Sequence, residues 1–290
     1  MSALNKKSFL TYLKEGGIYV VLLVLLAIII FQDPTFLSLL NLSNILTQSS
    51  VRIIIALGVA GLIVTQGTDL SAGRQVGLAA VVAATLLQSM DNANKVFPEM
   101  ATMPIALVIL IVCAIGAVIG LINGLIIAYL NVTPFITTLG TMIIVYGINS
   151  LYYDFVGASP ISGFDSGFST FAQGFVALGS FRLSYITFYA LSGVFYAFGG
   201  MLEAGRIGSA TNNLGFMYEL DAIAACVVGG VSFSGGVGTV IGVMTGVIIF
   251  TVINYGLTYI GVNPYWQYII KGAIIIFAVA LDSLKYARKK

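Results

Sequence analysis

The sequence predicts an all-α protein built as a polytopic transmembrane helical bundle. Of its 290 residues, 59% are hydrophobic and only 8% are charged, and the mean hydropathy is +1.02. A soluble domain carries about 25% charged residues. The apolar runs have the length of membrane-spanning helices and lack the alternating pattern of an outer-membrane barrel. We therefore interpret residues 1–290 as a single transmembrane domain.

The apolar runs indicate about nine spans. They cover residues 17–31, 53–65, 75–90, 105–130, 135–151, 185–200, 223–228, 238–256 and 268–281. The seventh is so short that it predicts a half-span. Residues 32–50 are expected to form a polar connection, and residues 152–184 an extracytoplasmic segment with interfacial aromatic side chains.

Positive charges gather near both ends of the sequence. They are Lys6, Lys7 and Lys14 before the first span, and Lys285, Arg288, Lys289 and Lys290 after the last. The positive-inside rule therefore predicts that both termini, the N-terminus included, lie in the cytoplasm. An odd number of spans would separate them, so one span is re-entrant or one is missing.

The composition argues against an enzyme. The chain has no histidine, and its two cysteines lie inside apolar runs, which leaves no His-based triad and no expected metal site. It contains no Walker-type phosphate loop and no Gly-x-Ser-x-Gly elbow. We expect no catalytic residues, no cofactor on this chain and no nucleic-acid partner. The lipid bilayer is expected to surround the chain.

The stretch Gly67–Gly73 interrupts two apolar runs and carries Asp69 between them. Glycine lets the backbone turn here, and Asp69 and Ser71 can cap the helix end that the break creates. A carboxylate near membrane depth is costly and should face protein or water. Two interpretations remain open and compatible: a capping turn, or a residue that lines a translocation path.

Small residues recur every four positions in the fourth span, at Gly116, Gly120 and Gly124. Such a stripe lets a neighbouring helix approach closely. Asn123 lies beside this stripe, and two roles remain open for it: an interhelical hydrogen bond or a residue of the path. Thr137 and Thr138 lie at the start of the next span. Residues 230–236 share a loose pattern with residues 67–73, which hints at two related halves.

Carboxylates reappear at Glu219 and Asp221. They can pair with Arg206 or Arg74, or cap a helix, and we favour the capping or structural role. Lys271 near the outer end of the last span is expected to snorkel to the interface.

Four groups of residues carry a resemblance to a known family. Residues 67–73, GTDLSAG, resemble the Asp-Leu-Ser-x-Gly signature of the ribose, galactose and branched-chain amino acid group of ABC importer permeases. Residues 120–124 (GLING) with 133–140 (TPFITTLG) are similar to a second signature. Residues 219–225 (ELDAIAA) with 229–230 (GG) and 234–238 (SGGVG) look like a third, and 266–272 (WQYIIKG) also fits.

The resemblance implies a permease subunit that forms the path for a monosaccharide by alternating access. Within the group, members that carry galactose and methyl galactoside resemble the chain most; ribose, autoinducer or branched-chain amino acid permeases remain alternatives. Implied partners are a second permease copy, cytoplasmic ATPase subunits and a periplasmic sugar-binding protein, at the bacterial inner membrane.

The resemblance also assigns site residues. The expected path residues are Asp69, Ser71, Asn123, Thr137 and Thr138. The structural signature comprises Gly67, Gly73, Gly116, Gly120, Gly124, Glu219, Asp221, Gly229, Gly230, Gly235 and Gly236.

The chain departs from the family pattern between Tyr189 and Ala190. Family members carry there a half-span, a basic cytoplasmic loop for ATPase docking and another half-span, making ten spans. Here two half-spans run together, which predicts an internal gap between residues 189 and 190.

An ion-coupled secondary transporter is the alternative from another class. It would need an intramembrane carboxylate that titrates or binds a cation, and Asp69 is the one good candidate.

Overall fold

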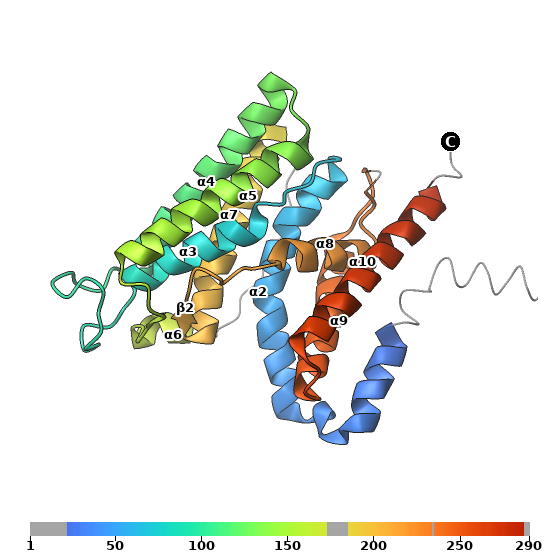
Figure 1. Cartoon of the computed structure of the whole chain (residues 1–290), viewed down its shortest axis with the longest axis horizontal. Coiled ribbons are helices and arrows are strands. Elements are labelled where there is room, and N and C mark those ends of the chain that lie inside the picture. Colours follow the sequence, from blue (N-terminus) through green and yellow to red (C-terminus); the bar gives the residue numbers. More distant parts are fainter. Residues whose placement is uncertain (1–21, 173–184, 234, 287–290) are drawn as a thin grey trace, which may run out of the picture. The chain divides into compact units, whose positions relative to one another are not determined.

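The computed structural model describes residues 22–172, 185–233 and 235–286 (Figure 1). A helix Leu22–Gln32 precedes the elements η1 Pro34–Leu37, α2 Leu39–Val64, α3 Ala72–Leu86, α4 Ile105–Leu130, α5 Pro134–Phe155, β1 Ile161–Ser162, α6 Ser166–Ala172, α7 Tyr185–Ile207, β2 Ser209–Ala210, α8 Tyr218–Val228, α9 Val240–Tyr259 and α10 Pro264–Tyr286. The predicted all-α class is confirmed. The chain divides into two compact units, Ile54–Leu220 and Met1–Ile53 with Asp221–Lys290.

In the unit Ile54–Leu220, α7 packs along both α3 and α4. Gly116 of α4 and Gly193 of α7 face each other so closely that a Cβ on either would collide with the backbone carbonyl of the other. Gly200 of α7 approaches the carbonyl of Val76 on α3 in the same way. Glycine is required at these positions because the helices touch backbone to backbone.

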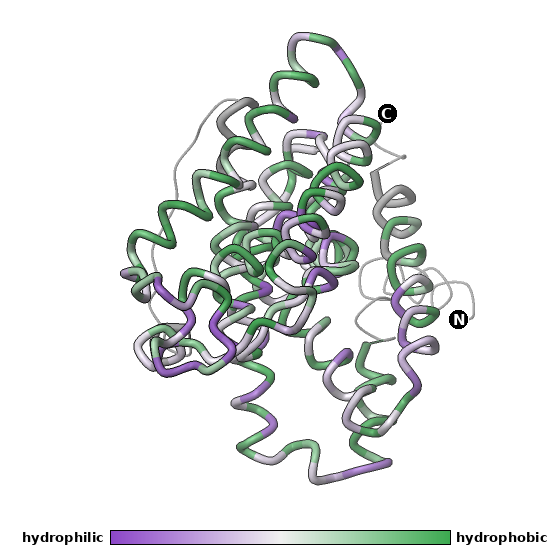
Figure 2. The backbone as a smooth tube through the Cα atoms, turned by 60° about the vertical axis from the view of Figure 1, so that its left-hand side comes forward, coloured by the Kyte–Doolittle hydropathy of each residue, from purple (hydrophilic) through white to green (hydrophobic). Residues whose placement is uncertain are grey.

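The predicted stripe is the buried face of α4. Gly116, Gly120 and Gly124 are buried together with Asn123, while Leu110 and much of the opposite face are exposed. A helix that is apolar all round and exposed on one side suits contact with lipid. In Figure 2 the helical tube is largely green, whereas purple gathers in the connections.

One end of this unit is closed by short polar connections. Strand β1 pairs with β2, with Ile161 opposite Ala210. Gln88 lies beside them and donates from Nε2 to the carbonyl of Ser162 at 3.0 Å. A cluster of buried side chains, including Ala204, lies beneath. The loops after α3, α5 and α7 therefore meet at the same end of the unit.

The other unit holds α8, α9 and the first half of α2. Gly242 of α9 packs against the carbonyl of Gly229, and Gly246 against that of Ala225 on α8. Tyr255 donates from its hydroxyl to Asn41 Oδ1 at 2.9 Å, which ties α9 to α2. The four-residue glycine spacing of α9 thus marks a helix contact, as in α4.

Four described helices are long and apolar enough to cross a membrane: α2, α4, α5 and α9. Helix α4 has the predicted bounds 105–130. Helix α8, with 11 residues, is too short to span, as expected of a half-span. Helix α7 runs without interruption from Tyr185 to Ile207, so residues 189 and 190 lie within one helix.

One expectation about connections is wrong. Residues 32–50 are not a loop, because α2 begins at Leu39 and Asn41 and Asn44 both hydrogen-bond with Tyr255. Asn41 and Asn44 therefore lie on the face of α2 that meets α9. Residues 152–184 contain the end of α5, β1 and α6; residues 173–184, like the basic residues before position 22 and after position 286, lie outside the described part.

Replacing Gly116 by leucine should lower the thermal midpoint in detergent. The side chain would push α4 away from α7, and overpacking of this kind costs about 1–3 kcal/mol. The matched control is Gly147→Leu on α5, because a Cβ added at Gly147 would meet none of the described atoms within 4 Å. Equal midpoints for the two variants would contradict the backbone contact.

Candidate functional site

The break between α2 and α3 is a capped helix end followed by a tight turn. Gln66 adopts φ +61°, its N–H donates to the carbonyl of Ile63, and Gly67 N–H donates to that of Leu62 at 2.8 Å. This pair of bonds is a Schellman cap. The prediction that Gly73 belongs to the break is wrong, because α3 begins at Ala72.

Gly73 has a packing role inside α3. A Cβ at this position would collide with the carboxylate of Glu219 and the carbonyl of Gly215. Gly77, one turn later, faces the carbonyl of Leu214 in the same way. The α7–α8 connection therefore lies directly on the first turns of α3, and glycine makes room for it.

Asp69 is 1% exposed and caps the turn. Its Oδ1 accepts hydrogen bonds from the Ser71 N–H at 2.8 Å and from Ser71 Oγ at 2.5 Å. An aspartate that accepts from the backbone two residues ahead fixes the chain direction before a helix. Asp69 thus caps the turn before α3, whereas Ser71, at the N-cap position of α3, makes no side-chain cap hydrogen bond. The expectation that Ser71 caps this helix is wrong.

Ser71 joins this cap to two neighbouring helices. Its Oγ accepts from Gln75 Nε2 at 2.9 Å and from Asn123 Nδ2 of α4 at 3.3 Å. Asn123 Oδ1 in turn accepts from Thr141 Oγ1 of α5 at 2.5 Å. Each hydrogen bond in this series is donated in the direction of Asp69, and the series therefore stabilises negative charge on the Asp69 carboxyl group.

Thr138 holds the turn from the side of α5. Its Oγ1 accepts from the Leu70 N–H at 3.1 Å and donates to the carbonyl of Pro134 at 2.8 Å. Thr137, 7% exposed, contributes its carbonyl, which accepts from Thr141. The five predicted path residues are thus brought to one place by the break, α4 and α5.

Three buried oxygens at this place have no partner among the described residues: Asp69 Oδ2, Gln75 Oε1 and Thr137 Oγ1. Buried polar atoms are paired in most folded proteins, so each of these calls for an explanation. Two of the three can only accept hydrogen bonds. The site can therefore take donors such as hydroxyl groups, or a proton.

Gln75 and Thr141 belong to this network but were not predicted from the sequence. Both lie four positions after a residue that was predicted, Ser71 and Thr137, and therefore on the same helix face. That spacing was the available signal. The partners across helices could not be read from spacing, because they depend on how α4 and α5 meet the break.

The second glycine-rich connection repeats the cap at the end of α8. Gly230 has φ +88°, its N–H donates to the carbonyl of Val227, and Val231 N–H donates to that of Cys226. In the structure Gly230 occupies the same cap position as Gln66. The sequence pattern of residues 67–73 and 230–236 instead pairs Gly230 with Gly67, one position later. Gly235 and Gly236 also have positive φ values, +79° and +72°.

A charged cluster closes the C-terminal end of α7. Glu203, which is 0% exposed, accepts two bonds of 2.8 Å from Arg206. Tyr218 donates to the same carboxylate at 2.6 Å. The suggestion that Arg206 pairs with Glu219 or Asp221 is therefore wrong: its partner is Glu203, one turn away on the same helix.

Asp221 lies in the first turn of α8 and accepts from Lys271 of α10 at 3.0 Å. Arg52 of α2 lies 3.7 Å from the same oxygen. Asp221 was expected to pair with Arg206 or Arg74, and its cationic partners are instead Lys271 and Arg52. Lys271 was expected to extend to the membrane interface, and its ammonium group instead pairs with Asp221. Arg74 stacks between the rings of Tyr146 and Phe216.

Comparisons with known proteins show which family the chain belongs to. The family model described as Branched-chain amino acid transport system / permease component matches residues 41–188 and 180–279. The chain is 86% identical to the galactose/methyl galactoside import permease protein MglC of Escherichia coli strain K12 over 336 residues, covering all of both chains. It is 69% identical to MglC of Haemophilus influenzae with the same coverage. The ribose import permease protein RbsC of Escherichia coli K12 is 33% identical, covering 94% of this chain and 95% of RbsC. No solved structure matches.

Asp69→Asn should leave the thermal midpoint nearly unchanged. Asparagine keeps an oxygen that accepts from Ser71 and caps as well as aspartate. Asp69→Leu should lower the free energy of unfolding by about 1–2 kcal/mol, because the Ser71 N–H and hydroxyl lose their acceptor. Thermal unfolding in detergent measures both, and equal losses would exclude the capping role.

Asp221→Leu should destabilise the unit that holds α8 and α10 by about 2 kcal/mol, because Lys271 and Arg52 lose their shared anion. The value lies below that of a fully buried pair because solvent reaches these side chains. Asp221→Leu with Lys271→Met should recover part of the loss. A double variant less stable than the sum of the single variants would contradict the pairing.

Proposed function

Because this chain belongs to the Branched-chain amino acid transport system / permease component family, we propose that it is the membrane-spanning permease subunit of an ATP-binding cassette importer for galactose and methyl galactoside. The substrate is assigned from the 86% identity to MglC over the full length of both chains. The relatives named for ribose are far less similar, at 33%.

A permease component is part of a transporter and not a catalytic enzyme. The proposed partners follow from that role: cytoplasmic ATPase subunits, which supply the ATP chemistry that this sequence lacks, and a periplasmic sugar-binding protein. A second copy of the permease would complete the path as a homodimer. The proposed location is the bacterial inner membrane with a cytoplasmic N-terminus, in line with the lysines at positions 6, 7 and 14.

The path residues proposed are those of the polar break. Asp69, Ser71, Asn123, Thr137 and Thr138 lie together, and the oxygens of Asp69 and Thr137 that lack a partner among the described residues are available to sugar hydroxyls. In the structure this place is closed, since Asp69 is 1% exposed. An alternating-access cycle would open it, by separating the break from α4 or α5.

Ion-coupled transport is the second candidate, and one observation favours it. Asp69 Oδ2 is buried and has no partner among the described residues, which suits a carboxylate that takes up a proton or cation. Uptake of galactose by vesicles that contain this chain alone, driven by a proton or sodium gradient without ATP, would support this candidate over the importer.

We also propose that the chain lacks an internal segment between residues 189 and 190. The alignment to the Escherichia coli relative extends over 336 residues, against the 290 of this chain, a difference of 46. The two matches to the family model overlap at residues 180–188. Helix α7 runs straight through this position. A segment of 46 residues has room for a membrane crossing of about 20 residues and a loop.

The test compares this chain with a version that carries the 46 residues of the relative after Tyr189. Both are co-purified with the ATPase and the binding protein, and galactose uptake is measured with ATP. We expect ATPase binding and uptake with the longer version and at least tenfold less with the chain of 290 residues. Equal binding and uptake would show that docking uses another cytoplasmic surface.

A further inference from the structure

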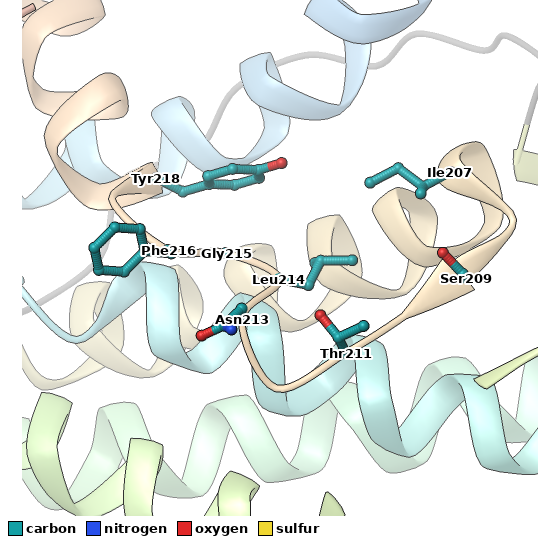
Figure 3. Close-up of a pocket in the computed structure, with 8 residues that line it drawn as sticks. All are labelled: Ile207, Ser209, Thr211, Asn213, Leu214, Gly215, Phe216 and Tyr218. Carbon is teal, nitrogen blue, oxygen red and sulfur yellow. The ribbon is translucent and has the colours of Figure 1, made fainter. Parts of the chain in front are cut away.

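We propose that the α7–α8 connection forms a subsite for an uncharged, polyhydroxylated small molecule of the monosaccharide class. The inference rests on the proposed function and adds a binding place apart from the polar break. A cavity of about 250 Å³ is lined by this connection together with Ile207 at the end of α7 and Tyr218 at the start of α8. Figure 3 shows Phe216 and Tyr218 on one side of it, Ser209 on the other, and Thr211 between them.

Two residues of the cavity lining are exposed at the surface of the unit, Ile207 at 46% and Phe216 at 48%. Strand β2, which begins the connection, pairs with β1, so the Ser209 end of the cavity lies near the loops after α3 and α5. The end of the cavity at Leu214 and Gly215 lies on the first turns of α3, at Gly77 and Gly73, and none of the residues that line the cavity belongs to the polar break.

The walls are held in place before a ligand arrives. The carbonyls of Leu214 and Gly215 rest against Gly77 and Gly73 of α3. The ring of Tyr218 is anchored through its hydroxyl to Glu203, and the ring of Phe216 stacks with Arg74. Binding to walls that are already ordered loses less conformational entropy than binding to a mobile loop.

The lining chemistry fits a sugar. Ser209, Thr211 and Asn213 present two hydroxyls and an amide, and within the described residues no protein group hydrogen-bonds to these side chains. They can both donate and accept. The aromatic rings supply apolar surface beside them, a combination typical of small-molecule sites. The volume of about 250 Å³ admits one small molecule.

The same lining disfavours an amino acid. Of the described residues that line the cavity, none is charged, and a zwitterion that leaves water without a partner for either charge loses hydration energy. The cavity therefore separates two substrate classes that occur in this family: neutral sugars and charged amino acids.

The test measures binding of D-galactose to the purified chain in lipid nanodiscs by saturation-transfer-difference NMR, with L-leucine as the second probe. We expect a signal from galactose and none from leucine at the same concentration. Thr211→Val with Asn213→Ala should weaken galactose binding about tenfold, because two hydrogen bonds are lost. Thr245→Val, which removes an exposed hydroxyl of α9 that donates to the carbonyl of Ile241 on its own helix, should leave binding unchanged.

Equal signals from galactose and leucine, or unchanged binding in the double variant with an unchanged thermal midpoint, would overturn the subsite. Uptake in vesicles with the ATPase and the binding protein separates this result from the proposed function. Binding at the cavity without uptake would contradict the importer and leave the subsite standing. Uptake that ignores the double variant, with no binding signal, would overturn the subsite alone.

Discussion

The close approach of helix backbones is the constraint on which the unit Ile54–Leu220 depends. Gly116 and Gly193 bring α4 and α7 into contact, and Gly200 brings α7 onto α3. In a membrane, lipid tails are as apolar as leucine, so helices associate through packing and hydrogen bonds instead of through exclusion from water. In the polar break, the hydrogen bond from Asn123 of α4 to Ser71 also needs α4 at this spacing.

The polar break uses that spacing. Asp69 and Ser71 turn the chain between α2 and α3, and Asn123 and Thr141 reach them from two other helices. If α4 stood farther away, Asn123 would leave Ser71. The network fixes the turn before α3 and gathers polar side chains within an apolar bundle. Whether Asp69 also lines a path stays a prediction.

Two buried carboxylates, one in each unit, are held by cations. Glu203 and Asp221 are buried or nearly so, and each has a cationic partner. Glu203 pairs within its own helix, whereas Asp221 joins α8 to α10 and faces Arg52 of α2. A chain with 8% charged residues thus uses several of them to hold its helices, because an unpaired charge away from water is costly.

Composition and helical periodicity were enough to predict the fold class, the bounds of α4 and the buried glycine stripe. The five residues around the break were predicted through the resemblance of residues 67–73, 120–124 and 133–140 to a permease family. The partners of Asp221, Arg206 and Lys271, the membership of Gln75 and Thr141, and the cavity of the α7–α8 connection emerged only from the folded chain. Each depends on which residue a neighbouring helix or strand brings within reach, and spacing along one chain segment carries no information about that neighbour.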